Sequence, residues 1–362
     1  MERGVRRAVV IGGGPAGAAT GLHLARAGWG VSLVEQRAYP RAKVCGEFIS
    51  PSATGALESV IAPERLAARG AVRVDRVAIE AGGRERTWRL SCPGWALGRG
   101  VLDAELIEAA RGAGATIVQP ARVVEVVTGA EGVEVRLEGG GVIRGDVVVH
   151  ADGRGRLDAG ARATREARGL VALKCHLRSR ACAAGEVRLR ACRGAYVGVI
   201  GIEGGRGTCA LVVRKSLLRE VPEPDALVGR LCPWYSREMR EGEWLACGVA
   251  RSGLMRGGHA RSLRVGNAAG AVDPVGGEGI GLALWGASRL AGELVRGGSI
   301  EEAGARYAEA LRARLRARRL GCAAAAWVLM RPRVVSAGWK VLDVPRAWSW
   351  MTGKGGGGLR SA

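Results

Sequence analysis

The sequence predicts an α/β protein in which a Rossmann-like nucleotide-binding domain is interwoven with a mostly antiparallel β-sheet substrate domain, followed by C-terminal helices. A strand, a glycine-rich turn and a helix open the chain between residues 5 and 27. Stretches of alternating apolar and polar residues, typical of antiparallel strands, interrupt the helical segments. A helical pattern covers residues 299 to about 330.

The order of these segments divides the chain into interlocked parts. We expect a discontinuous nucleotide-binding domain of residues 1–70, 93–168 and 250–310, a substrate domain of residues 71–92 and 169–249, and a C-terminal helical region of residues 311–362. A chain of 362 residues is long enough for two such domains.

Hydrophobic periodicity locates the individual elements. Residues 5–11 form an apolar, β-branched run that is typical of a buried parallel strand. Further strands are expected over 30–36, 71–80, 84–92, 146–150 and 260–265, with short strands through 115–150 and 170–247. Helices are expected over 16–27, 52–60, 101–112, 279–295 and 299–330.

The first turn has the spacing G-x-G-x-x-G, at Gly12, Gly14 and Gly17. In that order the glycines permit a tight turn, a close approach of the main chain to a pyrophosphate, and close packing of helix on strand. The helix that begins at Pro15 and Ala16 offers free N–H groups and a partial positive charge to the phosphate. The turn therefore predicts a dinucleotide site.

The end of the second strand indicates which dinucleotide is bound. Glu35 lies where a carboxylate accepts hydrogen bonds from ribose hydroxyls, and Gln36 and Arg37 follow it in the expected site. A carboxylate disfavours a 2′-phosphate, so FAD or NAD is favoured over NADP here.

Two later stretches decide between these cofactors by a resemblance. "VVVHADGRGR" (147–156) and "LRVGNAAGAVDPVGGEGIGLALWGA" (263–287) are similar to the Asp-Gly and Gly-Asp motifs of flavoproteins with the p-hydroxybenzoate hydroxylase fold. All three motifs occur in that family's order, and the resemblance covers most of residues 5 to 300. It implies that the cofactor is FAD.

The resemblance also implies where FAD lies. It places the second motif near the middle of the cofactor and the third motif along the ribityl chain and the flavin N1–C2=O edge, where a helix N-terminus stabilises the anionic reduced ring. Asn267 replaces the usual aspartate of the third motif but can still hydrogen-bond to the cofactor. The implied cofactor-binding residues are Arg99, Val123, Asp152, Gly153, Asn267, Ala268, Pro274, Gly277, Gly279 and Ile280.

The loop "RAKVCGEF" follows the second strand and is similar to the K-x-C-G-G stretch of geranylgeranyl reductases and related oxidoreductases. Cys45 and Gly46 match that stretch, while Glu47 replaces its next glycine. The resemblance implies that the loop lies against the flavin. Cys45, as a thiolate beside Arg41 and Lys43, and Glu47, as a proton donor, are the catalytic candidates. The alternative that the loop only forms a wall of the pocket remains open.

Two kinds of chemistry fit these motifs. The first is an FAD-dependent oxidoreductase that transfers hydride from reduced flavin N5 to an apolar small molecule such as an isoprenoid, a polyketide or another secondary metabolite. The alternative is an aromatic monooxygenase that uses a flavin hydroperoxide. The W-x-W-x-I-P signature of tryptophan halogenases is missing, and a non-catalytic FAD protein is a third class. With no second dinucleotide fingerprint, NAD(P)H is expected as a transient electron donor.

The composition of the chain limits the kinds of partner that we expect. The net charge of +21 arises from 55 basic and 34 acidic residues, but the arginines are scattered and no nucleic-acid-binding motif accompanies them, so no nucleic-acid partner is expected. The nine cysteines include no C-x-x-C pair, which favours a reducing cytoplasm, and we expect no metal site.

The C-terminal region is rich in tryptophan and cations. Trp327, Trp339, Trp348 and Trp350 alternate with arginines and lysines, a pattern that suits an amphipathic helix on a bilayer surface. Peripheral membrane contact is therefore one expectation, and a terminal helix that covers the core is the other. No run of about 18 apolar residues predicts a spanning helix.

Overall fold

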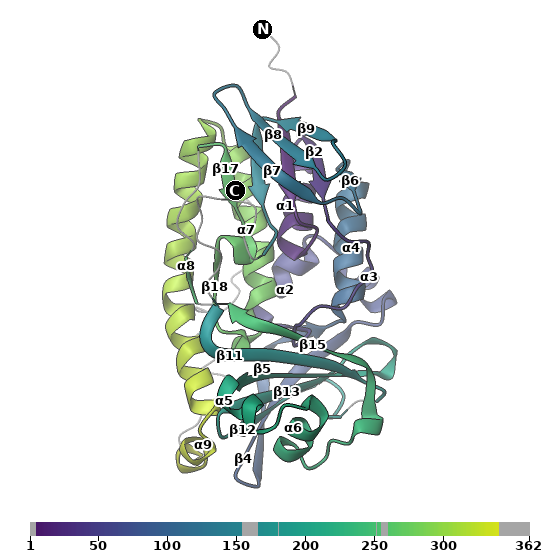
Figure 1. Ribbon diagram of the computed structural model, residues 1–362, viewed down its shortest axis with the longest axis vertical. Coiled ribbons are helices and arrows are strands. Elements are labelled where there is room, and N and C mark those ends of the chain that lie inside the picture. The colour runs from purple at the N-terminus through teal and green to yellow at the C-terminus, as the bar shows by residue number, and fades with distance from the viewer. Residues whose placement is uncertain (1–4, 154–165, 180, 251, 255–259, 340–362) are drawn as a thin grey trace.

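The structure is a computed structural model that describes residues 5–153, 166–179, 181–250, 252–254 and 260–339. Figure 1 shows its two bodies stacked along the long axis, with a parallel sheet and its helices above and a large sheet below. The long helix α8 (Ile300–Leu329) runs beside both. It begins at a capping box formed by Ser299 and Glu302.

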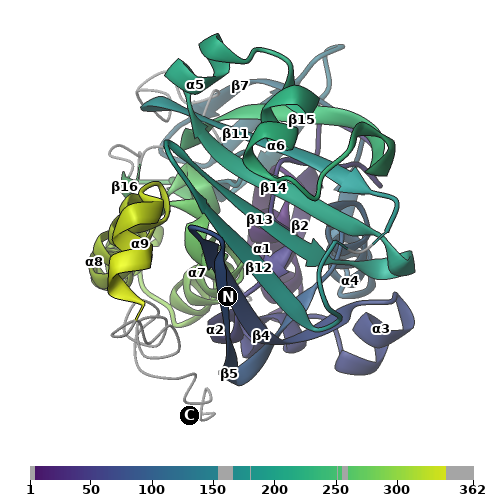
Figure 2. The ribbon, with the colours of Figure 1, turned by 90° about the horizontal axis from the view of Figure 1, so that it is seen from below.

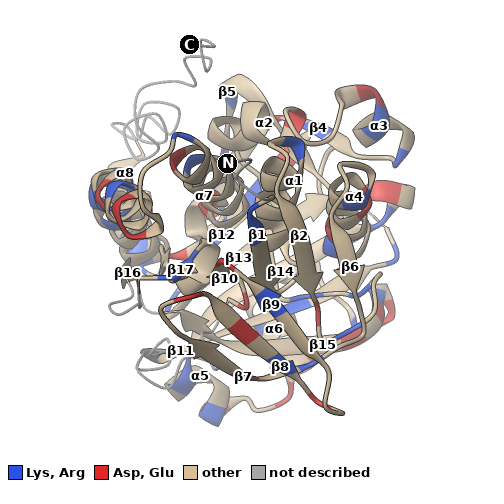
Figure 3. Cartoon of the chain, turned by 90° about the horizontal axis from the view of Figure 1, so that it is seen from above, with Lys and Arg blue, Asp and Glu red and all other residues tan. Residues whose placement is uncertain are grey.

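The upper body is a three-layer arrangement around a five-stranded parallel sheet. Its strand order is β17 (Ser262–Arg264), β10 (Val147–His150), β1 (Arg7–Ile11), β2 (Gly30–Val34) and β6 (Thr116–Val118). Helices α1 (Pro15–Arg26), α4 (Arg99–Gly112) and α7 (Glu278–Val295) cover one face, and the three-stranded sheet of β7 (Val123–Thr128), β8 (Val133–Leu137) and β9 (Val142–Gly145) covers the other (Figure 3). Both faces are buried, which explains why the central strands are almost wholly apolar.

The lower body is an eight-stranded sheet, called the large sheet below. Its order is β15 (Arg240–Ala250), β11 (Glu166–Leu177), β14 (Gly207–Arg214), β13 (Ala195–Gly201), β12 (Glu186–Cys192), β4 (Val72–Ala81), β5 (Arg84–Ala96) and β3 (Phe48–Ile49). Neighbouring strands are antiparallel except β12 and β4. Helices α5 (Lys215–Glu220) and α6 (Pro224–Leu231) pack on its outer face, as Figure 2 shows from below.

The inner face of the large sheet is turned toward the parallel-sheet body. Alternation along the strands separates the two faces. On β13, Val197 and Val199 pack with α6, whereas Tyr196 and Ile200 join the core that contains α1 and α7. The remaining elements are α2 (Pro51–Glu58), α3 (Pro63–Ala68), α9 (Pro332–Gly338), the short strands β16 (Gly253–Leu254) and β18 (Gly270–Ala271), and the single turns η1 (Glu203–Gly205), η2 (Arg237–Met239), η3 (Gly266–Ala268) and η4 (Pro274–Gly276).

The predicted fold class is confirmed, with differences at the boundaries. The strand expected over 84–92 continues to Ala96, because β3 adds to its far end. Helix α8 runs without a break across residues 310 and 311, where the C-terminal helical region was expected to begin. Trp348 and Trp350 lie outside the described residues. Within the described ranges, no helix is both long and apolar enough to span a bilayer.

Candidate active site

The glycine-rich turn has the geometry of a phosphate cradle. Gly12 has φ +103°, and a Cβ there would lie 2.7 Å from the Ala151 carbonyl oxygen; a Cβ on Gly17 would lie 1.8 Å from the oxygen of Gly12. At Gly14, the residue before α1, a Cβ would meet only Lys43 Nζ, at 3.7 Å. Two glycines thus allow close packing, and the third leaves room for a phosphate at the helix N-terminus.

Glu35 is held at the end of β2, where the sequence placed it. Its side chain is buried and accepts hydrogen bonds from the main-chain N–H groups of Gly13 (2.8 Å) and Arg37 (3.0 Å). Gln36 and Arg37 are exposed beside it. Val123 is buried in the core of the three-stranded sheet, so only its main chain could reach a nucleotide.

The other expected cofactor positions leave open space. A Cβ placed on Gly46, Gly153 or Gly279 would meet no atom within 4 Å. Pro274 and Asn267 are exposed. Ala16, Ala268 and Ile280 are buried and support the surrounding turns. Because these glycines and Gly14 leave room beside the main chain, the residues present fit FAD, whose pyrophosphate would lie at Gly14 and whose flavin edge would lie at the N-terminus of α7.

Arg99, which the resemblance implies as a cofactor-binding residue, is the first residue of α4. Its guanidinium donates to both carboxylate oxygens of Asp103, at 2.7 and 2.8 Å. Lys43 lies 2.8 Å from the same carboxylate. Burial would raise the pKa of Asp103, but the positive charges of Arg99 and Lys43 outweigh it and lower that pKa. Lys43 therefore ties the start of the loop to Asp103 of α4.

Cys45 is half-buried at the bend of the loop. Its sulfur accepts a hydrogen bond from the main-chain N–H of Glu47, at 3.3 Å. That N–H fixes the sulfur next to the open position at Gly46. Chemistry by this thiol stays a prediction.

Glu47 is the centre of a buried cluster that joins the loop to the large sheet. Its side chain is 0% exposed and accepts hydrogen bonds from the Arg99 main-chain N–H (2.7 Å), Lys174 Nζ (2.5 Å), His176 Nε2 (3.0 Å) and the Thr208 hydroxyl. We call Glu47, Lys174, His176 and Thr208 the Glu47 cluster. Both carboxylate oxygens are thereby engaged.

These contacts argue against Glu47 as a proton donor. Burial alone would raise its pKa, but the hydrogen bond from His176 and the charge of Lys174 outweigh burial and lower that pKa to about 2. A carboxylate that is already ionised at neutral pH has no proton to give. Glu47 also has φ +57°, a conformation natural to the glycine that it replaces and one that costs other residues about 1–2 kcal/mol. The ion pairs offset that strain.

The end of the loop is fixed against α7. A Cβ on Gly277, whose φ is +65°, would lie 2.7 Å from the Phe48 ring, so the two segments are in close contact. Ser50 and Ser52 donate to Glu278, the first residue of α7, at 2.7 and 3.0 Å. The whole stretch from Lys43 to Ser52 is therefore held in place.

Sequence reasoning missed one acid at this site. Asp273 directly precedes Pro274 and accepts hydrogen bonds at Oδ1 from the Tyr196 hydroxyl (2.8 Å) and the Val275 N–H (3.1 Å). Burial raises the pKa of Asp273, and these two hydrogen bonds offset only part of the rise. The sequence signal for Asp273 was a lone carboxylate in the otherwise apolar stretch "AGAVDPVGG". That stretch gives no indication that the partner of Asp273 is Tyr196.

Between Glu47 and Asp273, the inner face of the large sheet carries mostly small or apolar residues. Lys174 is paired across the strands with Ala210 and Leu245, and Ala210 with Gly198. Paired residues share a face, so these residues and the neighbouring pair Ala172 and Cys247 all face inward. The members of this apolar patch are half-buried: Ala172, Gly198, Ala210, Leu245 and Cys247.

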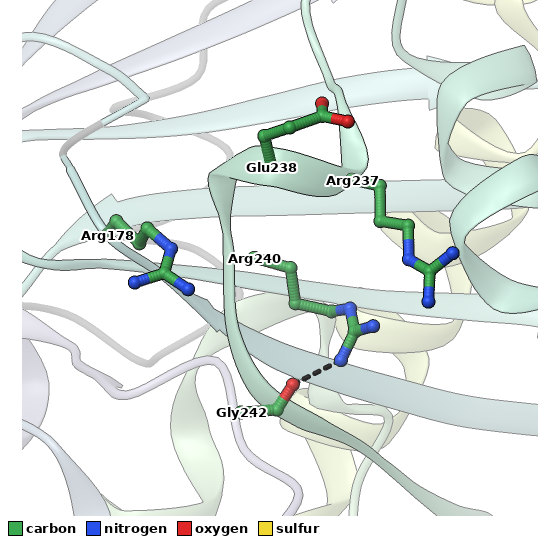
Figure 4. A pocket seen from close by; sticks show the side chains of 5 residues that line it. All are labelled: Arg178, Arg237, Glu238, Arg240 and Gly242. Carbon is green, nitrogen blue, oxygen red and sulfur yellow. Dashed lines mark hydrogen bonds between the residues drawn. The ribbon is translucent and has the colours of Figure 1, made fainter.

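A hollow lies at the edge of the large sheet, at the end of β11 and the start of β15. Figure 4 shows that it is lined by Arg178, Arg237, Glu238, Arg240 and Gly242, with the Arg240 guanidinium donating to the Gly242 carbonyl oxygen. Its lining is charged and contains none of the expected cofactor residues. It therefore does not suit an apolar substrate.

Fold and site together define a class of protein. Residues 6–167 match the FAD binding domain family, and they contain the phosphate cradle, Glu35 and the loop. The protein is a flavin-dependent oxidoreductase, and FAD is its cofactor.

Known proteins resemble the chain over most of its length. A curated menaquinone reductase of Mycolicibacterium smegmatis is 27% identical, over 81% of this chain and 77% of that protein. The flavin-dependent brominase Bmp2 has a TM-score of 0.80 at 18% identity, covering 95% of this chain and 93% of that one. PqsL of Pseudomonas aeruginosa, in complex with 2-aminobenzoylacetate, has a TM-score of 0.77 at 22% identity, covering 92% and 99%. The two structures share the fold.

Proposed function

We propose that the protein reduces a carbon–carbon double bond of an apolar, isoprenoid-type molecule. FAD, when bound and reduced, supplies the hydride at N5. The chain's own residues orient the substrate, exclude water and supply the proton. The Lys43–Ser52 loop and the turn at Pro274 hold the cofactor from two sides.

The apolar patch is the observation that carries this proposal. Its five residues come from four adjacent strands and are half-buried although they lie inside a sheet. Gly198 and Ala210 are its smallest members, and they lie on the face of the sheet that is turned toward the parallel-sheet body. An apolar molecule laid there gains from the removal of apolar surface from water. The 27% identity to a menaquinone reductase supports the same substrate class.

The test is an anaerobic single turnover. The flavin of the holoprotein is photoreduced, mixed with menaquinone-4 in detergent, and the product is exposed to air before mass spectrometry. A reduced double bond keeps its two added hydrogens in air, whereas a reduced quinone ring loses them. We expect a product that keeps them. Full recovery of unchanged menaquinone-4 and of a matching polyprenol would contradict the proposed function.

A monooxygenase is the second candidate, favoured by the likeness of the fold to PqsL, which is described as a probable FAD-dependent monooxygenase. Admitting oxygen to the reduced holoprotein with an electron-rich aromatic probe distinguishes the two. A hydroxylated product indicates the monooxygenase. Reoxidation without product, together with anaerobic reduction of the double bond, indicates the reductase.

The electron donor and the membrane contact belong to the same proposal. NADH or NADPH would bind transiently, and stopped-flow reduction of the flavin tests this donor.

Trp327 is 52% exposed, and the Arg331 guanidinium lies 4.0 Å from its ring centre. Trp339 instead stacks on Trp88, with the ring centres 6.3 Å apart. Trp327 is thus free to contact a bilayer that holds the substrate, in the cytoplasm. Trp327→Ser should weaken liposome flotation, and unchanged flotation would contradict this contact.

A further inference from the structure

Asp273 lies between the cofactor-binding turn and the apolar patch. It precedes η4 and the left-handed Gly277 that starts α7, the segment expected at the flavin edge. Its partner Tyr196 stands on β13, paired with Val212, which in turn is paired with Ala172 of the patch. One hydrogen bond therefore connects the flavin end of the upper body to the inner face of the large sheet.

We propose that Asp273 is the catalytic residue that protonates the substrate, and that Tyr196 is the positioning residue that orients its carboxyl group. This inference rests on the proposed function and adds to it the source of the proton. Both hydrogen bonds to the carboxyl group fall on Oδ1, so Oδ2 is the oxygen that carries the proton.

One carbon of the double bond would take the hydride that reduced FAD supplies, after a nicotinamide cofactor has reduced the flavin. The electron pair of the double bond then forms a C–H bond at the other carbon with the proton of Oδ2. The O–H bond of Asp273 breaks, and its carboxylate keeps the hydrogen bonds from the Tyr196 hydroxyl and the Val275 N–H. Water returns the proton after product leaves.

The groups around Asp273 suit this cycle of proton loss and return. Burial raises the pKa of Asp273, which favours its acidic form, and burial and the nearby Asp273 raise the pKa of Tyr196, which keeps its hydroxyl a donor. The other titratable groups at this point are Cys322 of α8 and the Glu278–Arg318 pair. Burial raises the pKa of Cys322 to about 12, so it stays a neutral thiol.

A second tyrosine–aspartate pair supplies matched controls. On the outer face of the large sheet the Tyr235 hydroxyl donates to Asp225, far from the cofactor-binding turns in the other core. Asp225→Asn and Tyr235→Phe thus remove the same groups without touching the site. Each variant is compared with the wild-type holoprotein in flavin absorbance, FAD affinity and the single-turnover rate with menaquinone-4.

We expect Asp273→Asn to slow the single turnover by about 100-fold or more, the usual contribution of a general acid, and Tyr196→Phe to slow it by about 10-fold. FAD affinity should stay within about twofold in both, as should every rate of the two controls. If Asp273→Asn turned over at the rate of Asp225→Asn, the proposal would be overturned. It would also be overturned if Asp273→Asn lost both its bound FAD and its turnover, because that result would mark a structural role for Asp273.

An infrared titration decides the matter without any substrate. The difference spectrum between wild type and Asp273→Asn isolates this carboxyl group, and we expect it to titrate above the ordinary aspartate range, and higher still in Tyr196→Phe. Titration at the ordinary value would overturn the proposal. A wild-type protein that reduces no probe contradicts the proposed function instead, so the two failures are distinguishable.

Discussion

The two acids on the inner face of the large sheet have opposite surroundings. Glu47 is ringed by Lys174, His176, Thr208 and a main-chain N–H, which lower its pKa to about 2. Asp273 is half-buried and faces a neutral hydroxyl and one N–H, and its burial raises its pKa. Titratable groups whose surroundings push their pKa values apart have different roles. The comparison makes Glu47 a structural ion and Asp273 the proton donor.

The same contacts give the Lys43–Ser52 loop a structural role. The two segments that carry the acids touch at Phe48 and Gly277. Glu47 bonds to β11 and β14 of the large sheet, and Asp273 bonds to β13. Charge therefore holds the loop at one end, and the hydroxyl of Tyr196 holds the turn at the other. The apolar patch lies between the two attachments.

The largest expected effect on stability is that of Glu47→Ala. It leaves Lys174, which is 1% exposed, as an uncompensated buried charge, and breaking such a pair typically costs about 3–5 kcal/mol. Urea unfolding of the holoprotein measures the loss. The double variant Glu47→Gln with Lys174→Met removes both charges and should recover most of it. An unfolding free energy unchanged in Glu47→Ala would refute the structural role.

Acid should weaken the protein through Glu47. Because its pKa falls from 4.5 to about 2 on folding, its contribution is present above pH 4.5 and is lost as the pH falls toward 2. The shift corresponds to about 3 kcal/mol. Stability measured from pH 7 to pH 2 should fall less steeply in Glu47→Gln than in wild type. Parallel curves would show that other groups dominate.

Asp273→Asn should act on stability with the opposite sign. The folded protein favours the protonated form, so the wild-type carboxyl group is stabilising below its unfolded pKa of 3.8 and becomes a cost as the pH rises through its folded pKa. We expect the variant to gain on the order of 0.5–1 kcal/mol at pH 7 and nothing at pH 3. Thermal unfolding at both pH values checks this. A loss at pH 7 would contradict the sign.

The smallest effect is expected at Cys45. Its half-buried sulfur is hydrogen-bonded by the Glu47 main-chain N–H and by the Arg99 side chain, so Cys45→Ala should cost about 1 kcal/mol and leave the single-turnover rate within about threefold. A shifted flavin absorbance with normal turnover would agree with a wall beside the ring. A loss of turnover as large as that of Asp273→Asn would instead make the thiol the reacting group.

Local signals in the sequence predicted much of this molecule. The turn at Gly12, Gly14 and Gly17, the buried Glu35 and the bounds of α1 and α7 follow from spacing and periodicity, because each depends on neighbours in the chain. The partners of the two acids do not. Glu47 bonds to Lys174 from 127 positions away, and Asp273 to Tyr196 from 77. Only the interleaving of the two bodies brings them together, so an acid expected from its type to give a proton is instead held as an ion.

The most direct test is the pH profile of the single-turnover rate in wild type, Asp273→Asn and Glu47→Gln, with menaquinone-4 and photoreduced holoprotein. Because the proton donor must be protonated, the wild-type rate should fall as the pH rises through the raised pKa of Asp273. Asp273→Asn should be slow and flat, and Glu47→Gln should keep the wild-type fall. A fall that persists in Asp273→Asn, or that disappears in Glu47→Gln, would contradict the assignment of the two acids.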